Sequence, residues 1–299
     1  MAREPIDTLV IHPGALGDVL QAVPALSSLE RLGHRITFAG QPRLGELLQG
    51  SGLVLAATPF DTFGIEALFA DVPVPDRLAS RLSRFQRAVS WFGAREPGYA
   101  GRLGALVPEV IVAPPVPDDD SPLTVWEHLV ETLGKWDVAR PAEHHALATT
   151  ERWRIAARTT FMALGVDESR PLLIAHPGAG ARWKEAPTAR VAKALERMVA
   201  GTGFEVLIHQ GPADGPAVNA LLAALSIPSR LLLEPPLTEL AGALALAQAY
   251  LGSDSGVSHL AASVGTPSVI LYPPETIRQW APWAPSAVAL GVGSEGDLS

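Results

Sequence analysis

The sequence predicts an α/β fold of two doubly wound domains, each built on its own parallel sheet. Three observations support this prediction. Strand-like and helix-like stretches alternate along the 299 residues, as they do in parallel sheets. The tetrapeptide His-Pro-Gly-Ala occurs twice, at residues 12–15 and 176–179. Each copy follows an apolar run and enters a glycine-containing turn, so each half of the chain begins as strand, turn and helix.

The elements of the first half follow in order from the spacing of apolar residues. The run at residues 9–11 predicts a strand, and Gly14 and Gly17 allow the turn after it. Apolar residues then recur with helical spacing over residues 18–33, where Pro24 should kink the helix or end its first turn. Further strands are predicted at residues 34–40, 53–57, 88–93 and 109–115, and an amphipathic helix at residues 76–89.

A change of composition marks the junction between the two domains. Pro-rich and polar stretches flank a helix predicted over residues 123–134, and the alternation restarts near residue 150. We therefore expect an N-terminal domain over residues 1–148 and a C-terminal domain over residues 149–299, facing each other across a cleft. The second half should contain strands at residues 171–178, 204–211, 249–253 and 266–274, and helices at residues 151–165, 189–203, 215–225, 237–247 and 255–265.

Composition excludes several classes of protein and of site. The chain has no cysteine, which excludes disulfides and thiolate metal sites. Its formal net charge of −8 argues against general nucleic-acid binding. No stretch is long and apolar enough to predict a membrane-spanning helix, and the first residues do not look like a signal peptide. We therefore expect a cytoplasmic protein.

The stretch AYLGSDSGVSHLAASVG gives the strongest indication of a ligand. A buried strand is predicted to end in Ser253-Asp254-Ser255-Gly256, directly before a helix of small residues. The free N–H groups at the start of such a helix attract phosphate, and Gly256 would let a ligand approach the backbone. His259 follows one turn later and can also reach an anion. The alternative is that Asp254 or Ser255 is an ordinary N-cap and that His259 is a core residue.

Four segments together resemble a known family. DSGVSHLAASVGTP resembles the D-[ST]-G-x-x-H-x-A-A-x-x-x-[TR]-P signature of glycosyltransferase family 9, which includes the ADP-heptose:lipopolysaccharide heptosyltransferases. LGDVLQAVPAL is similar to the family's G-D-[VI]-[VIL]-x-x-x-P-A-L, and HPGAGARWKEAP to its P-G-[AS]-x-x-x-x-K-x-W-P. LTELAGALALA resembles the helix before the signature strand, so the resemblance spans residues 8–285. It implies the GT-B architecture, in which two Rossmann-like doubly wound domains face each other across a cleft.

The resemblance implies a catalytic base in the first half. Asp18 matches the family's catalytic aspartate, which would take the proton from the acceptor hydroxyl as its oxygen attacks the anomeric carbon. The alternative is that Asp18 only caps a helix that starts at Val19, and the two roles are compatible.

The resemblance also implies the residues of a donor site in the second half. Lys184 matches the lysine that meets the phosphates of the nucleotide sugar, where a cation would stabilise the leaving diphosphate. Asp214 sits where relatives often carry a glutamate that binds the nucleoside. The other expected donor-binding residues are Gly178, Asp254, Ser255, Gly256 and His259. No cofactor or metal is required, although Asp254 would suit a divalent cation such as Mg²⁺ as well as it suits a helix cap.

The chain departs from the family pattern at several positions. His12 stands where relatives carry Arg or Lys, and Ala186 replaces the tryptophan of K-x-W-P. After the last signature strand, relatives often read F-G-P-T, whereas this chain reads Tyr272-Pro273-Pro274-Glu275. Glu275 would place negative charge near the donor site, so these departures bear on the identity of the donor sugar.

Arginines on the helix predicted over residues 76–89 suggest where the acceptor binds. Arg77, Arg81 and Arg84 have i, i+4 and i+7 spacing and should share one helical face. A solvated cationic face is the ordinary interpretation. The alternative is that these arginines hold the carboxylate or phosphate groups of an anionic glycolipid or glycan acceptor.

The sequence therefore predicts an inverting glycosyltransferase. It would move a sugar, in our expectation heptose from ADP-heptose, to a hydroxyl of a lipopolysaccharide-type or other surface glycan. A membrane-anchored acceptor implies at most peripheral association, at the inner face of the inner membrane. Two alternatives are a catalytically silent nucleotide-sugar-binding protein and a GT-B sugar-nucleotide epimerase. The second would need additional acid–base residues at the cleft, and no motif in the sequence marks them.

Overall fold

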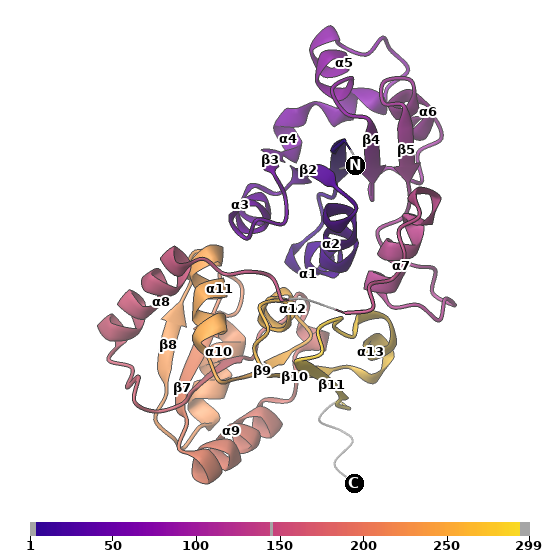
Figure 1. Ribbon diagram of the computed structural model, residues 1–299. Coiled ribbons are helices and arrows are strands. Elements are labelled where there is room, and N and C mark those ends of the chain that lie inside the picture. Colours follow the sequence, from indigo (N-terminus) through magenta and orange to yellow (C-terminus); the bar gives the residue numbers. More distant parts are fainter. Residues whose placement is uncertain (1–3, 144–145, 294–299) are drawn as a thin grey trace. The chain divides into compact units, whose positions relative to one another are not determined.

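A computed structural model of the chain describes residues 4–143 and 146–293. The chain forms two compact units, residues 1–143 and 144–299, each with its own parallel sheet (Figure 1). The predicted α/β fold class is confirmed. The division falls before the expected one at residue 148, and the N–H group of Leu147 donates to the carbonyl of Ser263 at 2.6 Å. That bond joins the segment before Thr149 to the second unit.

In its described part, residues 4–143, the first unit contains five strands together with their connecting helices. Its strands are β1 (Ile6–Ile11), β2 (His34–Gly40), β3 (Ala56–Pro59), β4 (Arg87–Ser90) and β5 (Glu109–Val112). Its helices are α1 (Leu16–Gln21), α2 (Val23–Arg31), α3 (Pro42–Gly50), α4 (Phe60–Phe63), η1 (Ile65–Leu68), α5 (Asp76–Leu82), α6 (Tyr99–Gly104), α7 (Val125–Thr132) and η2 (Gly134–Trp136).

The strand order of the first unit is β3-β2-β1-β4-β5, and every pair is parallel. This is the order of a Rossmann-like sheet, with its topological switch point between β1 and β4. Leu9 and Ile11 of β1 pack in one core with Leu78, Leu82 and Tyr99, from α5 and α6. Val10 points to the other face and is also fully buried. Both faces of the sheet are therefore covered, as a doubly wound fold requires.

Two predictions for the first unit have clear outcomes. The helical stretch from residue 18 does break near Pro24, because α1 ends at Gln21 and Pro24 lies in the first turn of α2. The helix predicted over residues 76–89 is wrong beyond Leu82. Arg87 pairs with Thr8 as the first residue of β4, so pairing with the central strand prevails over helical spacing there.

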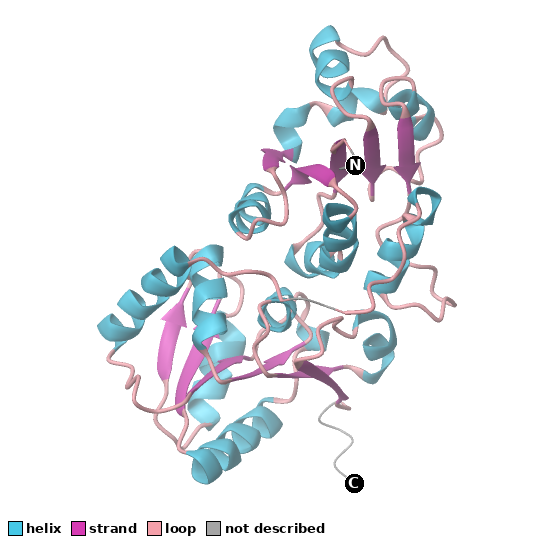
Figure 2. Cartoon of the chain, viewed as in Figure 1, coloured by secondary structure: helices cyan, strands magenta, loops and turns pink. Residues whose placement is uncertain are grey.

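Over residues 146–293, the second unit contains six strands. They are β6 (Leu172–His176), β7 (Glu205–Gln210), β8 (Arg230–Leu233), β9 (Ala249–Ser253), β10 (Ser268–Tyr272) and β11 (Ala287–Gly291). Its helices are α8 (Glu151–Leu164), η3 (Arg182–Lys184), α9 (Thr188–Thr202), α10 (Gly215–Ala224), α11 (Leu237–Leu246), α12 (Gly256–Ser263) and α13 (Pro274–Trp280). Figure 2 shows the strands of this unit with helices packed around them.

The second sheet repeats the Rossmann-like order of the first and adds one strand. Its order is β11-β10-β9-β6-β7-β8, again all parallel, with the switch point between β6 and β9. Leu173 and Ala175 face α9 and α10, and Ile174 between them is fully buried on the other face. The repeated tetrapeptides therefore occupy equivalent places, each beginning with a histidine at the carboxyl end of the strand from which its sheet is wound.

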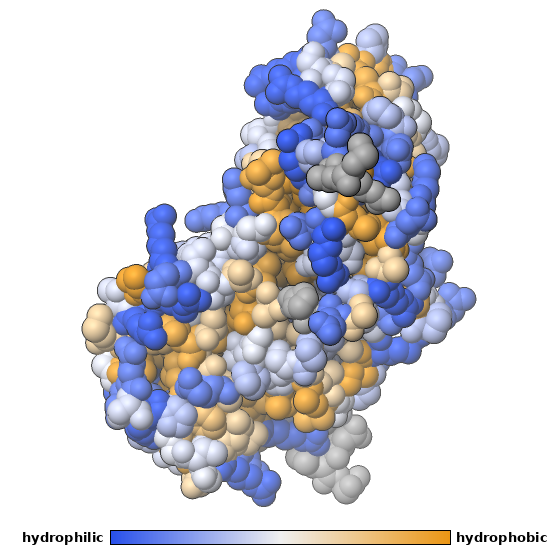
Figure 3. Space-filling model, viewed as in Figure 1, coloured by the Kyte–Doolittle hydropathy of each residue, from blue (hydrophilic) through white to orange (hydrophobic). Residues whose placement is uncertain are grey.

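The surface is of mixed polarity. On the face seen in Figure 3, hydrophilic and hydrophobic residues are interspersed over both units. In the part of the chain that the structure describes, no helix combines the length and apolar character needed to cross a membrane.

Candidate functional site

The loops at the carboxyl edge of the second sheet are tied together at Ser253, the last residue of β9. Its hydroxyl donates to the carbonyl of Pro177 at 2.9 Å and accepts the N–H group of Ala186 at 3.0 Å. These bonds join the end of β9 to the loop after β6, across the switch point where ligands of doubly wound sheets bind. The loop that carries Gly178 and Lys184 is thereby fixed beside the start of α12.

Lys184 and Asp254 form an ion pair at this edge. The Nζ–Oδ2 distance is 3.0 Å, and Asp254 is almost fully buried. The hydroxyl of Thr276 donates to the same carboxylate oxygen at 3.1 Å. The ammonium group also lies 5.5 and 5.3 Å from the ring centres of Trp183 and Trp280, within cation–π range. The structure thus places a positive charge next to the helix that the sequence predicts to bind phosphate.

Ser255 is the N-cap of α12. Its Oγ accepts the N–H group of Ser258 at 3.2 Å, which confirms the capping interpretation for this residue. Asp254 is not the cap, since its carboxylate pairs with Lys184 instead. A serine cap satisfies only one of the free donors, so other N–H groups at the helix start, including that of Gly256, can still meet an anion.

His259 is buried on α12 and neutral. Burial lowers its pKa to about 4; Asp254 opposes this shift and Lys184 adds to it. Its Nε2 atom has no hydrogen-bond partner among the described residues. The interpretation of His259 as a fully satisfied core residue therefore fails for this nitrogen.

Gly178 packs directly against Asp214. A Cβ atom at Gly178 would lie 2.2 Å from the Oδ1 atom of Asp214, so only glycine fits without moving the carboxylate. The other oxygen, Oδ2, accepts the N–H group of Gly211 at 2.8 Å. The structure therefore brings two of the predicted donor-site residues into contact and fixes Asp214 at the start of α10.

A histidine pair lies beneath this contact. His176 and His209 are buried with their Nδ1 atoms 3.0 Å apart, and the Nε2 atom of His176 is 3.9 Å from Asp214. Burial lowers the pKa of His176, and it lowers the pKa of His209 to about 3. Neutral imidazoles and a carboxylate, with one ligand atom of each within 4.8 Å of the others, could hold a transition-metal ion. In the structure the two imidazoles are hydrogen-bonded to each other instead.

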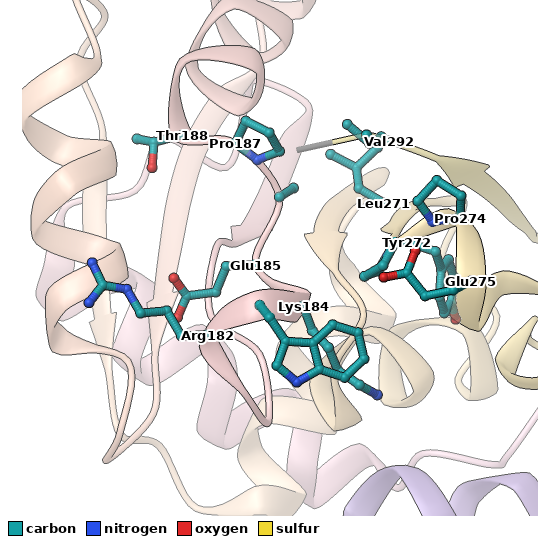
Figure 4. Close-up of a pocket in the computed structure, with 14 residues that line it drawn as sticks. Arg182, Lys184, Glu185, Pro187, Thr188, Leu271, Tyr272, Pro274, Glu275 and Val292 are labelled. Atoms are coloured by element: carbon teal, nitrogen blue, oxygen red, sulfur yellow. The ribbon is translucent and has the colours of Figure 1, made fainter. Parts of the chain in front are cut away.

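A pocket of about 510 Å³ opens beside Lys184 (Figure 4). One side is formed by η3 and the residues after it, including Arg182 and Glu185, and the other by the segment from Leu271 to Glu275. Val292 and Gly293, after β11, complete the lining. Its volume lies in the usual range for ligand sites, about 300–1,000 Å³.

The equivalent edge of the first unit holds Asp18. Asp18 lies in the first turn of α1, and its Oδ2 atom accepts the N–H group of Ala15 at 2.9 Å. The helix starts at Leu16, so Asp18 helps to cap it from the third helical position rather than from before Val19. His12 is buried, and burial lowers its pKa to about 4. A Cβ atom at Gly14 would lie 2.7 Å from the His12 ring and 2.9 Å from Cβ of Asp18, so this turn also requires glycine.

The three arginines expected to bind the acceptor do not share one helical face. Arg77 and Arg81 lie on α5, but Arg84 follows the end of the helix at Leu82. Arg81 donates to the carbonyls of Thr62 and Phe63, at 3.1 and 3.3 Å, and so stabilises the segment after β3. The predicted stripe is therefore wrong as a geometric unit, and the acceptor role of these residues stays a prediction.

Sequence reasoning missed several residues that shape the site. Ser253, Thr276 and Trp280 contact or position the ion pair of Lys184 and Asp254. Their roles depend on contacts between segments far apart in the chain. A signal existed only for Ser253, which directly precedes the recognised motif.

Comparison with known proteins identifies a matching family. The model of glycosyltransferase family 9 (heptosyltransferase) matches residues 111–298, which is more than half of the chain. The match includes the segments around Lys184 and Asp254. Among curated protein sequences, none matches the chain.

Solved structures share the fold at low sequence identity. A family 9 glycosyl transferase from Veillonella parvula DSM 2008 is 16% identical, with a TM-score of 0.76 over 98% of this chain and 92% of its own. The ADP-heptose lps heptosyltransferase II of E. coli is 21% identical, with a TM-score of 0.72 over 95% and 90%. The E. coli heptosyltransferase WaaC, solved with ADP, is 14% identical, with a TM-score of 0.66 over 96% and 93%.

Proposed function

The chain belongs to glycosyltransferase family 9, and from that premise we propose that it transfers heptose from ADP-heptose to a hydroxyl of a lipopolysaccharide-type or other surface glycan, with inversion at the anomeric carbon. The observation that carries this proposal is the ion pair between the partly exposed Lys184 and the buried Asp254, beside the start of α12. A lysine and free helix N–H groups at a Rossmann-like switch point are suited to a nucleotide diphosphate.

The similar structures support the choice of donor. One relative is an ADP-heptose lps heptosyltransferase, and WaaC was solved with ADP. In the proposed complex the diphosphate meets Lys184 and the N–H groups near Gly256, and it competes with Asp254 for the ammonium group. Asp214 accepts hydrogen bonds from the nucleoside. We assign a further phosphate contact to His259, which is neutral and whose buried Nε2 atom has no hydrogen-bond partner among the described residues.

In the proposed reaction the acceptor oxygen attacks the anomeric carbon as the bond from that carbon to the diphosphate breaks. Attack from the face opposite the leaving group inverts the configuration. The acceptor proton passes to the carboxylate of Asp18, which the start of α1 favours in its ionised form. The electron pair of the broken bond leaves with the diphosphate, where Lys184 and the N–H groups of α12 stabilise the added negative charge.

We further propose that transfer needs no metal. Lys184 occupies the carboxylate of Asp254, the group that a divalent cation would bind, so in this proposal Lys184 and the N–H groups of α12 meet the phosphates without a cation. Removal of divalent ions by EDTA should then leave the initial rate unchanged, and a rate that depended on added Mg²⁺ would contradict this part of the proposal.

The acceptor in this proposal is an anionic glycolipid or glycan. Such an acceptor is anchored in a membrane while the donor is dissolved, so the protein would work in the cytoplasm and associate peripherally with the inner face of the membrane. Arg77 and Arg84 are exposed and remain candidates for contacts with acceptor phosphates or carboxylates.

Binding and transfer measured side by side test the proposal. A panel of nucleotide sugars should raise the melting temperature, with ADP-heptose giving the largest shift, because a ligand that binds the native state stabilises it. ADP release should then accelerate when a heptose-accepting glycan is added. Lys184→Ala should weaken ADP binding about 10–100-fold, as expected for a charge-assisted phosphate contact.

The control for Lys184→Ala is the melting temperature of the ligand-free variant, since the substitution leaves Asp254 buried without its cation. If that temperature falls, the double variant Lys184→Ala/Asp254→Asn removes both charges and should restore it without restoring ADP binding. Unchanged ADP affinity in a folded variant would exclude the role of Lys184. Binding without transfer would favour the catalytically silent alternative.

A further inference from the structure

The pocket beside Lys184 extends away from the residue that we assign to the nucleoside. Asp214 follows β7 and Glu275 follows β10, and in the sheet order β10-β9-β6-β7 two strands separate them. Lys184 and the start of α12 lie at the intervening switch point. A nucleotide sugar likewise has two ends joined by a diphosphate. With the phosphates at Lys184 and the nucleoside at Asp214, the other end of the ligand extends toward β10 and its pocket.

The lining of this pocket suits a sugar better than a purine ring. Pockets for flat apolar groups are lined mainly by apolar and aromatic side chains. This pocket instead brings together charged groups from both sides, with Arg182 and Glu185 on one and Glu275 on the other (Figure 4). Trp183, a residue that is 59% exposed, adds a ring face against which the C–H groups of a sugar can pack.

Glu275 is the exposed carboxylate of this pocket, whereas Glu185 is partly buried. It lies in the first turn of α13, is exposed, and in Figure 4 points toward the pocket. Across the residues that the structure describes, no cation lies within 4.0 Å of its carboxylate, whereas Asp254 nearby is paired with Lys184. Glu185 is turned toward Arg182, whose charge acts on it. An ionised carboxylate only accepts hydrogen bonds, so its natural partners are the hydroxyl groups of a ligand.

We propose that the sugar end of the donor lies in this pocket and that Glu275 is a specificity-determining residue. It accepts hydrogen bonds from the hydroxyl groups of a neutral polyhydroxy sugar, and its charge disfavours sugars that carry a carboxylate. This inference rests on the proposed function, because the phosphates orient the donor. It concerns a position where this chain departs from the pattern of its family.

Calorimetry with ADP-heptose and with ADP alone separates the two ends of the ligand. Glu275→Ala should weaken binding of ADP-heptose at least about tenfold, since hydrogen bonds to charged groups are worth more than about 1.4 kcal/mol, the equivalent of a factor of ten. It should leave the affinity for ADP within about twofold, because ADP has no sugar to occupy the pocket. Glu275→Gln keeps the size of the side chain and should give an intermediate loss.

The matched control is Glu168→Gln, which makes the same change of charge on an exposed residue in the loop that leads into β6, at the opposite edge of the sheet. It should change neither affinity. Equal weakening of ADP and ADP-heptose by Glu275→Ala would show that the nucleoside occupies the pocket, and unchanged ADP-heptose binding would show that Glu275 does not touch the sugar. Either result overturns this inference about Glu275. The proposed function is tested separately, by whether the parent protein binds ADP. A parent protein that bound neither ligand would overturn both.

Discussion

Asp18 is the residue in which an observed capping role and the proposed catalytic role are combined. Its Oδ2 atom accepts the N–H group of Ala15, and the residue is only partly buried, which leaves room for the proposed contact with an acceptor. In Asp18→Asn the amide oxygen can still accept that hydrogen bond, but the group can no longer take a proton. We expect sugar transfer to fall by about 10²–10⁴-fold, the usual contribution of a general base. The measurement is the initial rate at saturating donor.

Two further measurements complete the test of Asp18. The melting temperature and donor affinity of Asp18→Asn should match those of the parent protein. Asp18→Ala, which also loses the bond to Ala15, should be less stable as well as inactive. A rate close to that of the parent in the Asn variant would leave Asp18 with a capping role alone.

Gly178 and Asp214 form a contact that a single methyl group would disturb. The new Cβ atom of Gly178→Ala would lie 2.2 Å from a carboxylate oxygen that is itself held in place through the bond to Gly211. We expect a loss of about 1–3 kcal/mol in the free energy of unfolding, as for other overpacked sites, together with weaker ADP binding. Denaturant titration and calorimetry measure the two effects.

Gly180→Ala is the control for that substitution. Gly180 is in the same loop, and its added Cβ atom would meet no atom within 4 Å, so both quantities should stay near those of the parent. Combining Gly178→Ala with Asp214→Ala removes the carboxylate with which the new methyl group clashes. The losses of stability of the two single variants should then not be additive. Additive losses would show that the contact is not the cause.

Residues within the motifs could be predicted as members of a site, but their partners could not. The sequence indicated Lys184, Asp254 and His259 because each lies in a segment with a recognisable pattern. That Asp254 pairs with Lys184 while Ser255 caps the helix depends on where two loops meet in space. No spacing in the sequence encodes that choice.

At the scale of elements, β9 and α12 are joined by a buried group of hydroxyls. The Oγ atom of Ser258 donates to the carbonyl of Ser253 at 2.6 Å and lies 2.8 Å from the hydroxyl of Tyr250. Ser258→Ala leaves both partners buried without this bond. We expect a loss of about 1–3 kcal/mol in the free energy of unfolding, measured by denaturant titration.

The same helix offers a matched control for Ser258. Ser263 is equally buried, but among the described residues its Oγ atom has no hydrogen-bond partner. Ser263→Ala should therefore be neutral or slightly stabilising. Equal losses from the two substitutions would mean that the hydroxyl network does not stabilise the junction of β9 and α12.

The elements that the sequence did not predict are mostly short. The helices α3, α4, α6 and α13 and the strands β8 and β11 have at most nine residues each, too few for a clear periodicity. The long helices α8 and α9 and the buried central strands were predicted near their observed bounds. α5 shows the opposite error, because helical spacing continued across Arg87 into a segment that pairs with β1.

At the scale of the whole molecule, buried histidines make the folding stability of both units depend on pH. His12 lies in the first unit, and His209 and His259 in the second; burial lowers their pKa values to about 4, 3 and 4. Each is neutral in the folded protein but has a pKa near 6.5 when unfolded. The unfolded chain therefore binds more protons below about pH 6.5, and stability falls as the pH drops toward the folded-state values.

The last prediction is therefore a loss of stability in mild acid. At pH 5 protonation stabilises the unfolded state by roughly 2 kcal/mol per such histidine. That pH lies about 1.5 units below the unfolded pKa, and each unit corresponds to about 1.36 kcal/mol. We expect the melting temperature to be constant above about pH 7.5 and to fall steadily between pH 6.5 and 5. Carboxylates with ordinary pKa values stay ionised over this range, so the fall reports on the histidines. His259→Gln removes one of the linked groups, so its melting temperature should decline less steeply. A melting temperature that did not change from pH 7.5 to 5 would mean that these histidines take up protons in the folded protein as readily as in the unfolded chain. A neutral His259 could then no longer be assumed at the proposed donor site.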